Sequence, residues 1–302
     1  MESVTREHVR KRTLTRDPRE QLIANLPVTE RRLTLNGFAT SVLEGGEGAP
    51  VVLLHGPGAY GAQWINTIPA LVRTHRVIAP DLPGHGASEF FDGAPTPQRV
   101  AGWLDDLIEC TCAKPPVLVG HTLGGAIAAR FAADGSRLLA ALVLVDTLGL
   151  AAFRPAPAFG AALQAYLHAP TERTHDDLWS QCVFDLPGVQ QRLGHEWQLI
   201  KAANLNGAGA SAISALNSWM NEFGIPAISA EVLKRIDTPT TLIWGRHDRA
   251  TPLAVAEAAS KQYSWPMAVI DGAADAPMLE QPEAFVSALR RALTPNIRTG
   301  VV

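Results

Sequence analysis

The chain has 302 residues, of which 47% are hydrophobic and 18% are charged, enough for one large core or a core domain with an insertion. A formal net charge of -3 argues against a nucleic-acid-binding surface, and no apolar run approaches the ~20 residues of a membrane span. Residues 1–20 are charged throughout and lack the apolar segment of a secretory signal. We therefore expect a cytoplasmic protein. Its N-terminal arm, residues 1–28, is a candidate for self-association as a homodimer.

Short apolar runs alternate with helical patterns along most of the chain. An Asn-Gly pair within residues 31–45 predicts a β-hairpin. Buried strands are expected to begin at Val51, Arg76, Val117, Ala141, Thr240 and Met267. Helical patterns occupy residues 64–73, 97–111, 123–133, 252–262 and 280–293. This alternation predicts βαβ units, hence an α/β fold with a mostly parallel sheet covered by helices on both faces.

The alternation stops between residues 150 and 231, where helical patterns occur without a convincing strand. We interpret this segment as a helical cap over the C-terminal ends of the strands, where open α/β sheets bind ligands. The core domain would then comprise residues 29–149 and 232–302. Four side chains of the cap are candidate pocket residues: Trp179, His195, Trp197 and Trp219.

Neither a metal nor a cofactor is expected. Cys110, Cys112 and Cys182 do not form a disulfide framework, and the first two point away from each other on a predicted helix. No histidine or carboxylate cluster has the spacing of metal ligands, and no phosphate-binding or dinucleotide-binding fingerprint is complete. The expected partner is a small-molecule substrate.

Five motifs carry a resemblance to a known family. They are LLHGPG from Leu53, DLPGHGAS from Asp81, GHTLGG from Gly120, GRHD from Gly245 and APMLEQPEAF from Ala276. In order and spacing they resemble the α/β-hydrolase superfamily, over roughly residues 30–293. The resemblance implies an eight-stranded, mostly parallel sheet flanked by helices, with a helical cap like that of the esterases, C–C hydrolases and epoxide hydrolases.

The family places a nucleophilic serine in a G-x-S-x-G turn, where this chain has Thr122. That turn exposes the hydroxyl above the sheet, at the start of a helix. The additional methyl group of threonine stiffens χ1 and crowds a tetrahedral intermediate. Thr122 is therefore a hindered nucleophile, a hydroxyl that binds substrate, or a residue that only keeps the turn folded. Without a general base we favour binding.

The family's general-base histidine precedes the last helix, and Asp275 occupies its position in IDGAADAP. The position of the triad acid retains Asp248. An aspartate titrates near ~3.9, too low to accept a hydroxyl proton usefully. The resemblance places the two carboxyl groups face to face, where one should hold a proton and act as an acid. The alternative is that Asp275 faces solvent in an inactive site.

The oxyanion hole is altered as well. One donor in the family is the residue after His-Gly, here Pro57, which has no backbone N–H. Leu123 can still donate, and Gly58 is a candidate replacement. His55 and His121 flank the expected site and are candidates to contact the oxyanion or the substrate, although such histidines usually have structural roles.

Three classes of function follow. The first is an enzyme that acts on a small apolar oxygenated molecule by acid–base chemistry, as a lyase, cyclase, isomerase, dehydratase or acid-assisted hydrolase. The second is a slow esterase with Thr122 as nucleophile. The third is a non-catalytic ligand binder or scaffold. An acid at Asp275, in place of a neutral or bulky residue, favours the first class, and by analogy alone such a site is typical of secondary metabolism.

Overall fold

The computed structural model describes residues 17–90, 93–135 and 137–293. The homodimer contact predicted for the N-terminal arm falls largely on residues 1–16, outside this range. Among the described residues, no helix combines the length and apolar character that a membrane crossing requires.

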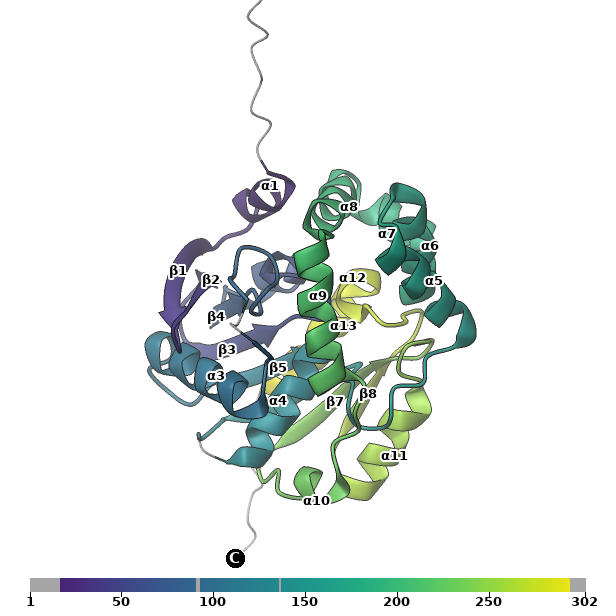
Figure 1. The fold of residues 1–302 in the computed structure, drawn as a ribbon. Helices are drawn as coiled ribbons and strands as arrows, with labels where there is room; N and C mark the ends of the chain where they lie inside the picture. The colour runs from purple at the N-terminus through teal and green to yellow at the C-terminus, as the bar shows by residue number, and fades with distance from the viewer. Residues whose placement is uncertain (1–16, 91–92, 136, 294–302) are drawn as a thin grey trace, which may run out of the picture.

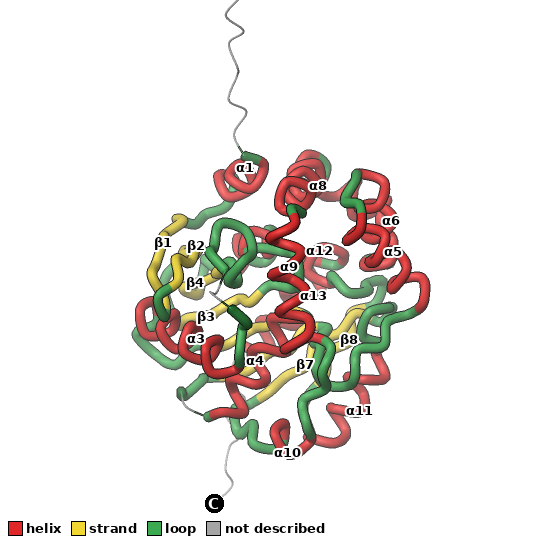
Figure 2. Tube along the Cα trace, viewed as in Figure 1, coloured by secondary structure: helices red, strands yellow, loops and turns green. Residues whose placement is uncertain are grey.

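Eight strands form a single sheet (Figures 1 and 2). They are β1 (Thr29–Leu35), β2 (Phe38–Gly45), β3 (Ala49–Leu54), β4 (His75–Pro80), β5 (Val117–His121), β6 (Ala141–Val145), β7 (Thr240–Gly245) and β8 (Met267–Ile270). Their order is β1-β2-β4-β3-β5-β6-β7-β8. Strand β2 runs antiparallel to β1 and β4, and the remaining pairs are parallel. This confirms the eight-stranded, mostly parallel sheet that the sequence predicts.

The hairpin at the start of the sheet follows from two residues. Asn36 has φ 46° and Gly37 has φ 84°, so both central residues of the turn are in the left-handed region. This is the type I′ geometry that matches the twist of two antiparallel strands and that Asn-Gly favours. The predicted hairpin is confirmed.

Helices cover both faces of the sheet, as Figure 2 shows in red around the yellow strands. The core helices and helical turns are α1 (Pro18–Ala24), η1 (Gly61–Trp64), α2 (Ile68–Leu71), α3 (Pro97–Thr111), α4 (Leu123–Asp134), α10 (Ala230–Leu233), α11 (Leu253–Tyr263), α12 (Pro277–Glu280) and α13 (Pro282–Leu293). The predicted helix over 64–73 is two short pieces, and α10 has no counterpart among the predicted helices.

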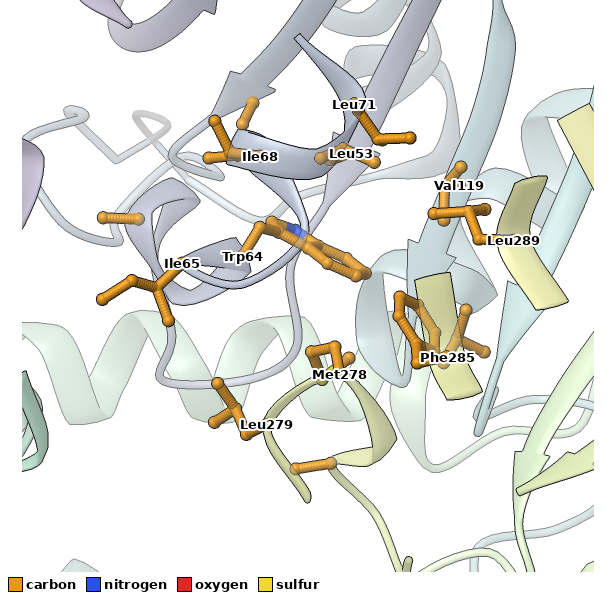
Figure 3. Packing of buried hydrophobic residues seen from close by; sticks show 14 of the residues in the cluster. Leu53, Trp64, Ile65, Ile68, Leu71, Val119, Met278, Leu279, Phe285 and Leu289 are labelled. Atoms are coloured by element: carbon orange, nitrogen blue, oxygen red, sulfur yellow. The ribbon is translucent and has the colours of Figure 1, made fainter. Parts of the chain in front are cut away.

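Alternate residues of each central strand enter opposite cores. In β3, Val51 and Leu53 belong to one hydrophobic cluster, and Val52 and Leu54 to the other. Figure 3 shows the first cluster, where Trp64 packs beside Leu53 of β3, Ile68 and Phe285 of α13. The ring centroids of Trp64 and Phe285 are 6.1 Å apart.

Five helices and a π-helical turn lie between β6 and α10. They are α5 (Pro157–His168), α6 (Glu172–Cys182), α7 (Leu186–Leu193), α8 (His195–Gly207), α9 (Ala210–Trp219) and η2 (Met220–Gly224), hereafter the inserted helices. Their buried side chains join both core clusters: Trp179, Val189 and Trp197 join the cluster of Trp64, and Trp219 and Phe223 join the other. Figure 1 shows α5 to α8 together on one side, with α1 beside α8.

Candidate active site

The turn between β5 and α4 holds Thr122 in a strained conformation. Its φ of 46° and ψ of -106° are rare for a β-branched residue and cost on the order of 1–3 kcal/mol. The backbone is crowded there, because a methyl group on Gly120 would lie 2.4 Å from the Gly124 carbonyl oxygen. The Thr122 N–H donates to the Val145 carbonyl at 2.9 Å, which ties the turn to β6. The strain is thus imposed by the surrounding structure.

Thr122→Gly is expected to stabilise the protein by on the order of 1 kcal/mol, because glycine adopts positive φ without strain. Thr122→Ala is the matched control: it also removes the hydroxyl but keeps a Cβ, so it should not gain this energy. The midpoint of urea unfolding measures both. Equal stability of the two variants would contradict the assignment of strain to the Thr122 backbone.

The Thr122 side chain borders a pocket. Its Oγ1 is buried and has no hydrogen-bond partner among the described residues. The pocket has a volume of about 170 Å³ and lies between the strand ends and the inserted helices. Most of its walls are apolar, with contributions from Leu148, Phe153, Phe159, Leu163, Tyr166, Leu167, Leu178, Trp179, Leu216 and Met220. The polar lining residues include His121, Thr122 and Asp275, together with Gln63, Asn204 and Asn217.

Asp275 lies in the wall of this pocket, and its side chain is 16% exposed. Its backbone N–H donates to the Cys182 carbonyl at 3.0 Å, which joins the loop before α12 to the end of α6. Its carbonyl oxygen lies 2.6 Å from the His121 Nε2, and its Oδ1 lies 3.4 Å from the same nitrogen. Asp275 therefore contacts the residue that precedes Thr122.

Asp248 is buried close to Asp275, although no hydrogen bond joins the two side chains among the described residues. Its Oδ1 accepts from the backbone N–H groups of Ala250 at 2.7 Å and Thr251 at 2.9 Å, whereas its Oδ2 has no partner among the described residues. Burial, followed by the charge of Asp275, raises the pKa of Asp248 well above its ordinary value. Asp248 thus holds its proton more readily than an exposed aspartate.

Sequence reasoning missed a third carboxyl group, Asp146, which follows β6 and has φ 43°. Its Oδ1 accepts from the Gly245 N–H at 2.8 Å. Burial, then the charges of Asp248 and Asp275, raise the pKa of Asp146 well above its ordinary value. The sequence did contain a signal for Asp146, because it directly follows a buried parallel strand. The carboxyl ends of such strands meet at one edge of the sheet, where sites form.

The fourth carboxyl group, also missed, is Glu280 in α12. It accepts the backbone N–H groups of Phe184 at 2.5 Å, Ala274 at 2.7 Å and Ala276 at 3.3 Å. Burial raises the pKa of Glu280 to about 7. Its three bonds fix the loop that carries Asp275 and join it to the inserted helices. The residue lies inside a motif that the sequence singles out, but only as a marker of the fold.

Of the two predicted oxyanion donors, Gly58 borders the pocket and Leu123 is buried next to Thr122. Leu123 is the first residue of α4, where N–H groups have no intrahelical acceptor. Gly58 has φ 69° and lines the pocket next to Pro57. Both predicted donors therefore lie in the neighbourhood of Thr122.

His55 lies outside the pocket lining, contrary to its prediction as a binding residue. Its Nε2 accepts from the Leu82 N–H at 2.8 Å, so its Nδ1 carries the proton and donates to the Gly56 carbonyl at 2.8 Å. Burial, and then the charge of His85, lower the pKa of His55 well below its ordinary value. The ring is neutral and has both nitrogens occupied, which indicates a structural role.

Of the four candidate residues in the inserted helices, Trp179 alone lines the pocket among the described residues. His195 is exposed at the start of α8. Trp197 is fully buried, with its ring centroid 5.0 Å from that of Trp179, and Trp219 donates its Nε1–H to the Pro83 carbonyl at 2.8 Å. Packing against neighbouring helices explains both tryptophans.

A second cavity of about 360 Å³ adjoins the pocket. The two share Gly58, Ala59, Tyr166, Leu167, Asn204 and Leu216. The second cavity also contacts Arg19 of α1, so it lies between α1 and the inserted helices.

Metal-binding geometry does not occur among the described residues: no three histidine, cysteine or acidic side chains are grouped to hold an ion. Cys110, Cys112 and Cys182 are free thiols.

Comparison with known proteins relates this geometry to a family. A model of the alpha/beta hydrolase family matches residues 51–288. The chain is 29% identical to the 2-hydroxy-6-oxo-6-(2'-aminophenyl)hexa-2,4-dienoic acid hydrolase of Metapseudomonas resinovorans, over 86% of this chain and 89% of that protein. It is 30% identical to the 2-hydroxy-6-oxo-6-phenylhexa-2,4-dienoate hydrolase of Comamonas testosteroni, over 72% of this chain and 78% of that protein.

A solved structure shares the fold. The meta-cleavage product hydrolase CumD of Pseudomonas fluorescens IP01 superposes with a TM-score of 0.75 at 24% identity, covering 89% of this chain and 98% of that one.

Proposed function

Because this chain belongs to the alpha/beta hydrolase family, we propose that it is an enzyme that acts on a small, neutral, largely apolar oxygenated molecule by acid–base chemistry. The reaction is that of a lyase, cyclase, isomerase or dehydratase, or a hydrolysis by an acid-assisted water, without a serine acyl-enzyme. The observation that carries the proposal is Asp275 in the pocket wall, at the position of the family's histidine and close to buried Asp248.

The carboxyl groups supply the proton. Burial raises the pKa values of Asp146, Asp248 and Glu280, and the charge of Asp275 contributes to each shift. Asp275 is the member of this group that lines the pocket. It can give a proton to the substrate or take one from it, with protonated Asp248 nearby as a reserve.

Thr122 and Leu123 are assigned to substrate binding. A free hydroxyl donates to or accepts from a substrate oxygen, and the first N–H groups of a helix favour a partial negative charge. Together they would hold a carbonyl or hydroxyl beside Asp275. The inserted helices serve as the cap that closes the apolar end of the pocket.

The pocket indicates the charge of the substrate. Among its described lining residues there is no lysine or arginine to pair with a carboxylate. The charge of Asp275, which contributes to the raised pKa values of its neighbours, would repel an anion. The two relatives named above are hydrolases of dienoic acids. We therefore propose that this chain differs from them in taking a neutral molecule.

A slow esterase is the second candidate, because the unpartnered Thr122 Oγ1 lies in the turn that carries the family's nucleophile. The methyl group of Thr122 and the missing N–H of Pro57 both disfavour it.

Turnover of nitrophenyl esters from acetate to octanoate tests the proposal. We expect slow turnover without a burst, reduced up to about tenfold in Thr122→Ala, which loses a binding hydroxyl, and on the order of 100-fold in Asp275→Asn. Nitrophenyl butyrate should be a better substrate than the anionic nitrophenyl hemisuccinate of equal chain length. A burst in the wild type that disappears in Thr122→Ala would favour the esterase instead. Tight binding of these esters without any turnover would favour a non-catalytic binder.

A further inference from the structure

We infer that His121 is a base that takes a proton from the substrate beside the Thr122 hydroxyl, in addition to the carboxyl chemistry proposed for Asp275. The inference rests on the proposed function, because it names the group that moves the proton in the same site. In the family that position is simply the residue before the nucleophile, and the sequence gives His121 only a candidate contact role.

The hydrogen bond between His121 and Asp275 fixes the tautomer of the imidazole. The His121 Nε2 lies 2.6 Å from the main-chain carbonyl oxygen of Asp275. A carbonyl oxygen only accepts, so Nε2 must carry the proton and donate it. In the neutral ring Nδ1 is then an unprotonated acceptor, which is the state that a general base requires.

The unprotonated nitrogen lies close to Thr122, beside Gly56. A methyl group on Gly56 would lie 2.9 Å from the His121 Nδ1 and 2.4 Å from the Thr122 Oγ1. Both polar atoms therefore pack against the Cα of Gly56, where a side chain would clash with them. Gly56, His121 and Thr122 all line the pocket, and the Thr122 Oγ1 has no partner among the described residues.

The arrangement suits one hydroxyl oxygen, from the substrate or a water molecule, held between the two groups. The Thr122 hydroxyl binds this substrate or water oxygen, and the O–H bond of the substrate or water points to the His121 Nδ1. When the proton moves, the O–H bond breaks, its electron pair stays on oxygen, and an N–H bond forms on the imidazole. No oxidant, metal or second reactant is needed for this step.

Asp275 and Trp64 hold the ring in place. The Asp275 Oδ1, 3.4 Å from Nε2, would stabilise the imidazolium that forms. Trp64 packs edge-on, with ring centroids 6.2 Å apart and planes at 75°. Asp275 thus acts on His121 as the triad acid acts on its histidine, and is a positioning residue for the base besides being part of the pocket wall.

Carbethoxylation by diethyl pyrocarbonate, a small neutral reagent that attacks unprotonated imidazole nitrogen, tests the accessibility of Nδ1 without any substrate. In the full-length protein, peptide mapping should show His121 modified, and at least tenfold more slowly in Gly56→Ala. The exposed His195 should react equally in both proteins and serves as the internal control. Equal rates at His121 in both proteins, or no reaction at His121 while His195 reacts fully, would overturn the inference.

His121→Gln separates this inference from the proposed function. Glutamine keeps an N–H donor for the Asp275 carbonyl but has no basic nitrogen. Ester turnover should fall on the order of 100-fold at an unchanged melting temperature, with partial rescue by added imidazole. Unchanged turnover in His121→Gln, together with loss in Asp275→Asn, would refute the base and leave the proposed function standing. Turnover indifferent to both variants would refute the proposed function and the base together, even if His121 is modified as expected.

Discussion

The double variant Thr122→Ser/Asp275→His is expected to hydrolyse nitrophenyl butyrate at least 100-fold faster than the wild type. A histidine at position 275 lies in the pocket wall, near the Asp248 Oδ2 that has no partner among the described residues. The imidazole removes the negative charge of Asp275 and gives Asp248 a cationic partner, so the pKa of Asp248 should fall and the carboxylate can orient the new base. Serine at position 122 removes the obstructing methyl group.

The two single variants are the controls for this result. Thr122→Ser alone gains a less hindered hydroxyl, and Asp275→His alone gains a base. Each single variant should therefore increase the rate of nitrophenyl butyrate hydrolysis much less than the double variant. Pro57→Ala in the double background restores a backbone N–H, and one oxyanion donor is worth around 10²–10³ in rate. A folded double variant that remains inert would contradict the view that the site keeps the family's geometry with altered side chains.

Asp248→Asn is expected to stabilise the protein at alkaline pH, by on the order of 1 kcal/mol or roughly 2–4 °C in melting temperature. Asparagine keeps an oxygen for the N–H groups of Ala250 and Thr251 and removes a buried group that ionises. Because the pKa of Asp248 is raised on folding, the native state holds a proton that the unfolded chain has lost above ~3.9. The free energy of unfolding therefore falls as the pH rises from the unfolded-state pKa of Asp248, near ~3.9, to its higher pKa in the native state.

The stability difference between variant and wild type should accordingly be small at pH 4.5 and largest at pH 8. His55 and His85 have lowered pKa values, so they reduce the stability of the fold as the pH falls below ~6.5. Both proteins contain these histidines, and their effect therefore cancels in the difference between variant and wild type. Asp134→Asn, at the exposed end of α4, is the control and should leave the profile unchanged. An Asp248→Asn variant less stable than the wild type at pH 8 would show that the ionised carboxylate stabilises the fold.

Local patterns predicted the parts of the fold that depend on neighbours in sequence. The Asn-Gly turn, the helix at Pro97–Thr111 and the strand before Thr122 need only turn chemistry and apolar periodicity. Helix α7 was missed, since its eight residues include Pro187 and Gly188 and its burial depends on packing against distant helices.

The site was predictable in its residue types and less so in its contacts. The motifs located Thr122, Asp248 and Asp275, but the burial of Asp146 and the three bonds of Glu280 join segments far apart in the chain. The proton position on His121 depends on one carbonyl 154 residues away. His55, Trp197 and Trp219 match a site residue in type, yet backbone hydrogen bonds or aromatic packing occupy them.

The attachment of the inserted helices to both hydrophobic clusters governs how a substrate reaches Thr122. A hinge motion that lifted them as one body would expose Trp179 and Trp197 on one side and Trp219 and Phe223 on the other. Each such side chain buries roughly 150–250 Å², at about 25 cal/mol per Å², so exposing all four would cost on the order of 15–25 kcal/mol. We therefore expect molecules to enter through the cavity between α1 and α8, because that path leaves both clusters packed.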